Sequence, residues 1–203
     1  MRIIETHRAP NPRRVGIFLA EKGIQVPREE RDLMTGSLRD EDFSAVNPWQ
    51  RVPVLVLDDG RVIAESVAIC RYFEELYPQP ALFGTGPFGR AEVEMWNRRV
   101  ELGLFNAVAS VFRHLHPKMA ELEVPQIVDW GEANRDKVQD ELARLDCRLA
   151  QSAFIAGDLY SIADITALVA IDFMKPARVG KPDGFANVVR WYRQVSARPS
   201  AAA

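Results

Sequence analysis

A segment crowded with helix-breaking residues divides this chain into two stretches. From Tyr77 to Gly89 the sequence contains three prolines and three glycines, a density that is typical of a linker. We therefore predict a first domain over residues 1–79, a linker over 80–88 and a second domain over 89–203.

Strand and helix patterns alternate in the first stretch. Asn11 is a favourable N-cap, Pro12 suits the first helical position, and Gly23 is a natural helix end. Asp59-Gly60 between two apolar runs is a strong hairpin signal. The predicted order is β-α-β-α-β-β-α, over residues 2–6, 12–22, 26–31, 37–43, 52–57, 62–64 and 65–76. Such an order indicates a small mixed sheet with helices on its faces.

Only helical patterns follow the linker. They cover residues 91–112, 138–149, 162–173 and 188–195. The third of these is apolar nearly all round, which predicts a central, buried helix. Ser161 and Asp164 match a capping box that opens this helix. We predict an all-α second domain.

Composition and charge narrow the class of function. The 203 residues are 47% hydrophobic and 27% charged, an ordinary globular balance, and the net charge of −2 predicts neither a nucleic-acid nor a membrane partner. Cys70 and Cys147 form no CxxC pair and no metal-ligand spacing, so we expect no metal. The N-terminus shows no apolar signal region, and we expect a reducing, cytoplasmic location.

Several motifs together resemble the glutathione transferase family over nearly the whole chain. They occupy residues 11–15, 19–23, 47–55, 65–66, 161–164, 190–192 and 196–199. The resemblance is to cytosolic, bacterial-type members. It implies an α/β thioredoxin-like first domain, an all-α helical bundle as the second, and a homodimer. It also implies glutathione as co-substrate, with no bound cofactor.

The resemblance implies a glutathione site in the first domain. Val52, before a cis Pro53, would offer its N–H and C=O to the cysteinyl part; the alternative is a trans proline on an edge strand. Ser66, at a helix N-terminus, would bind the γ-glutamyl carboxylate and Glu65 the ammonium group beside it. The alternative is a Ser66 that only caps the helix.

Two polar residues precede the proline. In many family members a polar or basic side chain at this place reaches the glycyl carboxylate of glutathione, which Arg51 or Gln50 would do here through a hydrogen bond. Two exposed loop side chains explain the same residues.

The residue that activates the thiol departs from the family pattern. The family uses Tyr, Ser or Cys near the end of the first strand, and residues 6–12 contain none of them. Asn11 lies where some bacterial-type members have cysteine or asparagine. Its amide would donate a hydrogen bond to a thiolate, aided by the helix dipole. The alternative is an Asn11 that only caps its helix, and Thr6 is a hydroxyl alternative.

Two histidines are further candidates for the reaction centre. His114 or His116, with Ser110, would hold a water near the thiol, as is thought for atypical family members. The alternative is that both only favour a helix C-terminus.

An apolar pocket for the second substrate is expected on the first helix of the second domain. Phe105, Val108 and Phe112 are its candidates, although core packing or dimer contact explains them equally well. The resulting function is conjugation of the glutathione thiolate to small hydrophobic electrophiles, the activity of a glutathione S-transferase. The alternatives are a glutathione-dependent disulfide reductase or peroxidase, and a non-enzymatic ligand-binding or interaction protein.

Overall fold

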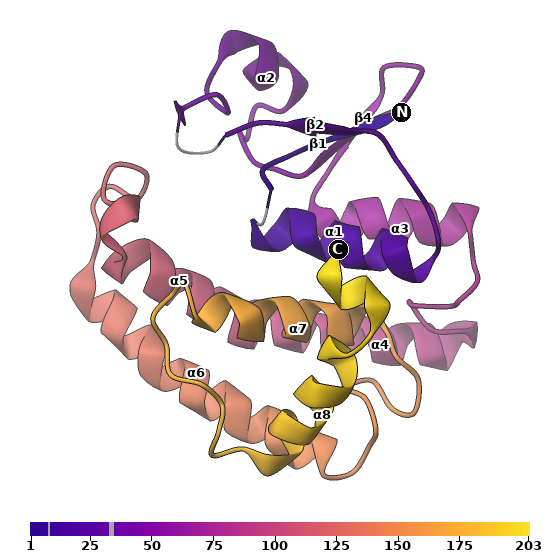
Figure 1. Ribbon diagram of the computed structural model, residues 1–203, viewed down its shortest axis with the longest axis vertical. Coiled ribbons are helices and arrows are strands. Elements are labelled where there is room, and N and C mark those ends of the chain that lie inside the picture. Colours follow the sequence, from indigo (N-terminus) through magenta and orange to yellow (C-terminus); the bar gives the residue numbers. More distant parts are fainter. Residues whose placement is uncertain (8, 33–34) are drawn as a thin grey trace. The chain divides into compact units, whose positions relative to one another are not determined.

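A computed structural model describes residues 1–7, 9–32 and 35–203 of the chain (Figure 1). They form two compact units, Met1–Ala81 with Pro199–Ala203, and Leu82–Arg198. The last five residues of the chain pack with the first unit.

The first unit is built around a four-stranded mixed sheet in the order β2-β1-β3-β4. Its elements are β1 (Arg2–Glu5), α1 (Pro10–Glu21), β2 (Arg28–Glu30), α2 (Glu41–Val46), β3 (Val54–Val56), β4 (Val62–Ala64) and α3 (Ser66–Leu76). β1 pairs parallel with β2 and antiparallel with β3, which pairs antiparallel with β4. This thioredoxin-like order confirms the predicted βαβαββα arrangement.

Both faces of the sheet are covered (Figure 1). Figure 1 shows α1 and α3 side by side on one face and α2 on the other. On the α2 side, Ile4, Val54 and Val56 pack with Leu38 and Phe43 in one apolar cluster. Successive strand residues point to opposite faces, so the sheet needs both layers to bury its apolar side chains.

Helix α1 begins one residue earlier than the expected cap. Ala9 is the N-cap in extended conformation and Pro10 is the first helical residue. The prediction of Asn11 as N-cap is therefore wrong, because Pro10 already takes the first position that proline prefers. The predicted end is confirmed, since Gly23 follows the C-cap Lys22 with a φ of 65°.

A buried cation joins the ends of α1 and α3. The Lys22 side chain is fully buried, and its Nζ lies 2.7 Å from Glu74 Oε2. The same nitrogen donates to the carbonyl oxygens of Tyr77 at 2.6 Å and Pro80 at 2.7 Å. Burial of this charge is stabilised by one carboxylate and two carbonyls.

The last residues of the chain pack on α1. They form a 3₁₀ turn, η4 (Pro199–Ala202), and Arg13 Nη2 donates to the carbonyl of Ala201 at 3.0 Å. Ser200 Oγ also donates to the carboxylate of Glu21. These contacts explain why this segment belongs to the first unit.

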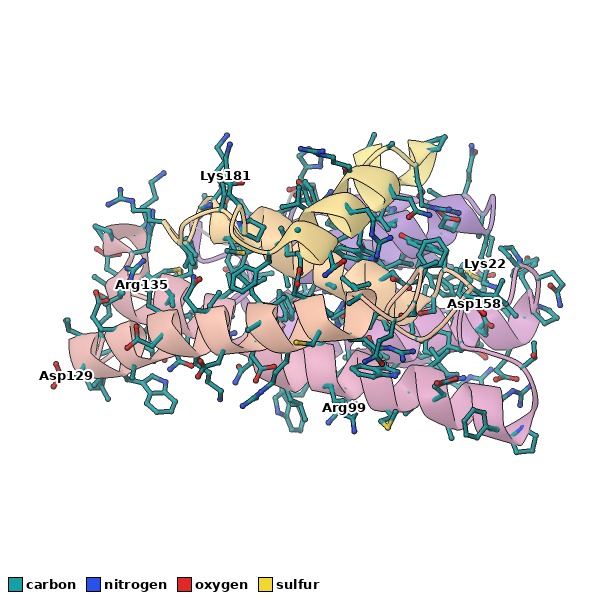
Figure 2. All side chains as sticks on the ribbon, turned by 90° about the horizontal axis from the view of Figure 1, so that it is seen from below. Lys22, Arg99, Asp129, Arg135, Asp158 and Lys181 are labelled. Atoms are coloured by element: carbon teal, nitrogen blue, oxygen red, sulfur yellow. The ribbon has the colours of Figure 1, made fainter. Side chains whose placement is uncertain are left out.

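The second unit is helical, as predicted. Its elements are α4 (Gly86–Val100), the π-helical η2 (Glu101–Phe105), α5 (Asn106–Leu115), the 3₁₀ turn η3 (Pro117–Met119), α6 (Val128–Leu149), α7 (Ile162–Met174) and α8 (Ala186–Ser196). α4, η2 and α5 follow one another without a break and contain the predicted helix 91–112. Figure 2 shows Asp129 in the first turn of α6 and Arg135 farther along the same helix. Arg135 Nη1 donates to the carbonyl of Arg178 at 2.9 Å.

Helix α7 is the core of this unit. Nearly all of its residues are buried, which confirms the prediction of a central helix. It begins with the predicted capping box, in which Asp164 Oδ2 accepts from the backbone N–H and the hydroxyl of Ser161, both at 3.0 Å. Within the described part of the chain, no helix has the length and apolarity needed to cross a bilayer.

Candidate functional site

The loop before β3 contains the residues expected to offer a backbone contact to glutathione. The Val52-Pro53 peptide bond is cis, as expected. Asn47, only 4% exposed, organises this loop: its Nδ2 donates to the carbonyl of Arg51 at 2.8 Å and its Oδ1 accepts from the N–H of Trp49 at 3.2 Å. Asn47 is a supporting residue that the sequence reasoning missed.

The two polar residues of this loop differ in their freedom. Gln50 has a φ of 54° and donates through Nε2 to Ser44 Oγ at 3.0 Å. Its side chain is therefore already engaged with helix α2. The Arg51 side chain is exposed to solvent, so it has room to reach a ligand.

A strained residue opens helix α3. Glu65 is its N-cap with a φ of 68° and a ψ of 120°, a conformation that costs a residue other than glycine about 1–3 kcal/mol. Such strain is concentrated at functional sites. Ser66 is the first helical residue and only 4% exposed, so Glu65, not Ser66, occupies the cap position.

Ser66 and Asn11, 55 residues apart in sequence, meet in the fold. Ser66 Oγ donates to Asn11 Oδ1 at 3.4 Å and accepts from Arg14 Nη1 at 3.0 Å. Two of the predicted site residues are thus brought together, and a third residue, Arg14, is added to them. The Arg14 side chain is completely buried.

The sequence itself contains a signal for the buried position of Arg14. Arg14 lies four residues before Phe18, on the face of α1 that is buried. Arginine is almost never fully buried unless it is paired. A charged residue on the apolar face of a helix therefore indicates a specific partner.

Thr6, the hydroxyl alternative to Asn11, is engaged with backbone. Its Oγ1 donates to the carbonyl of Arg31 at 2.6 Å, which ties the end of β1 to the residue after β2. The hydroxyl hydrogen of Thr6 is therefore directed at a carbonyl.

His114 supports a loop of the second unit. Its Nδ1 accepts from the N–H of Ile127 at 3.1 Å, and its Nε2 lies 3.8 Å from Glu123 Oε1. The ring thus connects the end of α5 with the residues that precede α6.

His116 has a similar local role. Its Nδ1 accepts from the N–H of Lys118 at 3.2 Å, which caps η3, and its ring centroid lies 4.8 Å from that of Phe112. Burial lowers the pKa of His116, and the charges of Arg178 and Lys118 lower it further. This histidine therefore favours the neutral form.

The three expected pocket residues differ in exposure. Val108 is fully buried and Phe105 is 8% exposed, so both contribute to the core of the second unit. Phe112 is half-buried, and its ring centroid lies 5.0 Å from that of Phe173. Among the three, Phe112 therefore has the most surface to offer a ligand.

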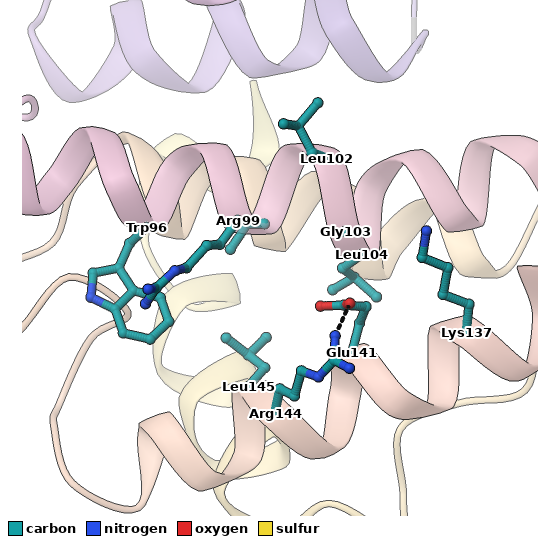
Figure 3. A pocket seen from close by; sticks show the side chains of 10 residues that line it. Trp96, Arg99, Leu102, Gly103, Leu104, Lys137, Glu141, Arg144 and Leu145 are labelled. Carbon is teal, nitrogen blue, oxygen red and sulfur yellow. Dashed lines mark hydrogen bonds and ion pairs between the residues drawn. The ribbon is translucent and has the colours of Figure 1, made fainter.

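A separate cavity of about 460 Å³ lies between α4–η2 and α6 (Figure 3). Its lining includes Trp96, Arg99, Leu102, Lys137, Glu141 and Arg144, and none of the three expected pocket residues. Gly103 leaves room here, because a Cβ on it would lie 2.7 Å from Glu141 Oε2. The π-helical turn η2 also lies at this cavity, and such turns are frequent at functional sites.

The fold and the cis-proline loop place the chain in a class of two-unit proteins with a thioredoxin-like first unit. A thioredoxin-like unit with a cis-proline loop, beside a helix that begins at a strained residue, is combined with an all-helical unit. Residues 9–76 match the glutathione S-transferase N-terminal domain and residues 117–199 the glutathione S-transferase C-terminal domain. The chain belongs to the glutathione transferase family.

Individual relatives support this assignment over the whole chain. The chain is similar to glutathione S-transferase 2 of Saccharomyces cerevisiae, with 36% identity covering 98% of this chain and 87% of that protein. It is similar to maleylacetoacetate isomerase of Pseudomonas aeruginosa, with 39% identity covering 81% and 77%. A crystal structure of a glutathione S-transferase domain-containing protein from Marinobacter aquaeolei matches with a TM-score of 0.95 and 41% identity, covering 98% of this chain and 99% of that one.

The family relationship supports a glutathione-dependent activity in general terms. The relatives carry the names of a transferase and of an isomerase, so the family alone does not define the reaction.

Proposed function

We propose that this protein is a glutathione transferase that conjugates the glutathione thiolate to small hydrophobic electrophiles. The observation that carries the proposal is the meeting of Asn11 and Ser66 through a hydrogen bond of 3.4 Å. It brings the candidate for thiol activation beside the candidate for carboxylate binding. Both would then act on a single bound tripeptide.

In this proposal, backbone and side chains share the binding of glutathione. Val52, before Pro53, pairs through its N–H and C=O with the cysteinyl part, as an added strand does. The α3 N-terminus, with Ser66 and Glu65, holds the γ-glutamyl end, where unpaired N–H groups favour a carboxylate. Exposed Arg51 reaches the glycyl carboxylate, with Gln50 as the alternative.

Asn11 activates the thiol without acting as a base. Its Oδ1 accepts from Ser66, which leaves the amide hydrogens to point at the sulfur. A thiol pKa lowered by about 1.4–2 units from near 8.5 requires about 2–3 kcal/mol of thiolate stabilisation. One hydrogen bond to a charged acceptor supplies about 1.5–3 kcal/mol, and the α1 N-terminus adds to it.

The second substrate is an apolar electrophile. Phe112, which is half-buried, would be its main contact, whereas Phe105 and Val108 are buried and would contribute less surface. Catalysis then consists of proximity and an activated nucleophile, with glutathione as co-substrate and no resident cofactor. We also propose a cytoplasmic location, because a reducing compartment suits the two free thiols of Cys70 and Cys147.

The test begins with binding. The protein should be retained on immobilised glutathione and should turn over a chlorodinitrobenzene-type substrate. The Asn11→Ala variant should raise the thiol pKa of bound glutathione by about one to two units, the equivalent of its lost hydrogen bond. An unmoved pKa would exclude Asn11 as the activating residue.

The same experiment separates the alternatives. Binding without conjugation, together with reduction of a peroxide or a disulfide, would favour the reductase or peroxidase. Absence of binding would favour a non-enzymatic ligand-binding or interaction protein.

We also propose that the protein forms a homodimer through the exposed face of α4, η2 and α6. Phe88, Met95 and Leu102 recur every seven residues along α4 and η2, with exposures of 79%, 41% and 56%. An exposed apolar row of this kind favours burial against the same row of a second copy, because a two-fold interface is made by the same patch on both subunits.

Leu102→Glu should therefore shift the mass measured by light scattering from dimer to monomer. Leu159→Glu, at a residue 77% exposed outside this face, is the matched control and should leave the mass unchanged. A wild-type monomer would contradict the dimer without affecting the proposed activity.

A further inference from the structure

Arg14 is a fully buried cation at the edge of the proposed glutathione site. It lies on α1 three residues after Asn11, so both side chains are on the same face of the helix. Its Nη1 donates to Ser66 Oγ at 3.0 Å. A buried guanidinium aimed at the hydroxyl of a predicted ligand-binding residue calls for a role of its own.

The hydrogen bonds at Ser66 have a defined direction. Arg14 donates only, so Ser66 Oγ must accept from it and turn its own hydrogen elsewhere. In the structure that hydrogen points to Asn11 Oδ1, across 3.4 Å. This distance is long for an O–H···O bond, so the hydroxyl can exchange Asn11 for a stronger acceptor with little loss.

The charge of Arg14 acts on the beginning of α3. Burial raises the pKa of the Cys70 thiol, one turn after Ser66, to about 12, and the charge of Arg14 acts in the opposite direction. The other buried cation of α1 has a different place, because Lys22 binds Glu74 near the end of α3. The two cations thus serve opposite ends of the same helix.

We propose that Arg14 is a positioning residue for the carboxylate of the γ-glutamyl end of glutathione. It holds Ser66 Oγ as an acceptor, so that the hydroxyl hydrogen is presented to the incoming carboxylate. It also places a positive charge behind that carboxylate, in surroundings of low dielectric. Arg14 does not touch the substrate, and the inference rests on the proposed glutathione site.

The test compares glutathione with an analogue that lacks this one carboxylate, γ-aminobutyryl-cysteinyl-glycine. Arg14→Met should raise the KM for glutathione by about 10–100-fold, as expected for loss of a charge-assisted interaction, with a kcat within about three-fold. With the analogue, wild type and Arg14→Met should have the same KM. Arg14→Lys, which keeps the charge, should recover most of the loss.

Two further variants separate charge from structure. Arg13→Met removes another cation of α1, one that binds the carbonyl of Ala201. This variant should leave the KM for both ligands unchanged. Arg14→Gln keeps a donor for Ser66 without the charge, and it serves also if the methionine variant does not fold. Its KM for glutathione should rise, whereas a wild-type KM would overturn the proposal.

The failing outcomes are distinct. If Arg14→Met raises the KM for glutathione and for the analogue equally, Arg14 only stabilises the fold and the positioning role is wrong. If wild-type protein binds neither ligand, the proposed function itself fails.

Discussion

The indole Nε1 of Trp191 donates to Asp164 Oδ1 at 2.8 Å, and both side chains are completely buried. The contact ties α8 to the first turn of α7. Asp164 Oδ1 also accepts from the N–H of Ile155 at 3.0 Å, and Oδ2 accepts twice from Ser161. One carboxylate therefore joins three segments of the second unit.

Replacement of this carboxylate should be strongly destabilising. Asp164→Ala leaves buried donors without an acceptor, and we expect a loss of about 3–5 kcal/mol in the free energy of unfolding. Urea titration measures this loss. Asp158→Ala, at an exposed residue shortly before α7, is the control and should change the free energy by less than about 0.5 kcal/mol.

The same residue should make stability depend on pH. Burial raises the pKa of Asp164 to about 6 from 3.8, against the hydrogen bonds that lower it. The folded protein therefore binds the proton of the Asp164 carboxyl more tightly than the unfolded chain does. This protonation adds about 3 kcal/mol to the free energy of unfolding at a pH below the unfolded-state pKa of Asp164, and the contribution is lost as the pH rises through about 6.

Urea titrations of wild type and Asp164→Asn between pH 4 and pH 7 measure this pH-dependent contribution to the free energy of unfolding. The advantage of wild type over the variant should shrink as the pH rises through this window. A constant difference would show that Asp164 keeps its usual pKa in the folded protein.

Removal of the Lys22 charge should destabilise the first unit. Lys22→Met leaves Glu74 as a buried carboxylate and two carbonyls without their donor. We expect a loss of about 3–5 kcal/mol in the free energy of unfolding. In the double variant Lys22→Met, Glu74→Gln the loss should be smaller than the sum of the two single losses. Simple additivity would mean that the two charges do not interact.

Two glycines at the start of the second unit should differ sharply in their tolerance of alanine. Gly84 and Gly86 have φ values of 78° and 62°, so both substitutions share a similar backbone strain. A Cβ at Gly84 would lie 2.4 Å from the carbonyl oxygen of Gly89, whereas none of the described atoms lies within 4 Å of one at Gly86.

Gly86→Ala should therefore cost about 1 kcal/mol, and Gly84→Ala at least about 2 kcal/mol more. Thermal unfolding of the two variants compares them directly. Equal melting temperatures would show that the turn moves to relieve the contact.

Local patterns account for most of what the sequence predicted correctly. Asp59-Gly60 predicted a hairpin because its turn needs a positive φ, and Gly60 has a φ of 84°. The apolar run 162–173 predicted a central helix because no face of it could remain in water. The start of α1 was misplaced at Asn11, because two prolines near it offer the same signal.

For the candidate site too, the sequence selected the residues but not their conformations. The resemblance selected Val52, Pro53, Glu65 and Ser66 as neighbours of one ligand. It did not reveal that Asn47 holds the loop or that Glu65 takes a φ of 68°. These depend on how the loop closes, which a pattern of residue types does not encode.

By itself, the sequence determined the order of elements and the family, since each follows from local periodicity and short motifs. Only the tertiary structure decided that Arg14 lies against Ser66, 52 residues away, and that Ser66 reaches Asn11, 55 residues away. It also decided that the residues after Arg198 return to α1. The contacts of Ser66 arise from the packing of α1 and α3 on one sheet face, and no local pattern specifies the partners of any of these contacts.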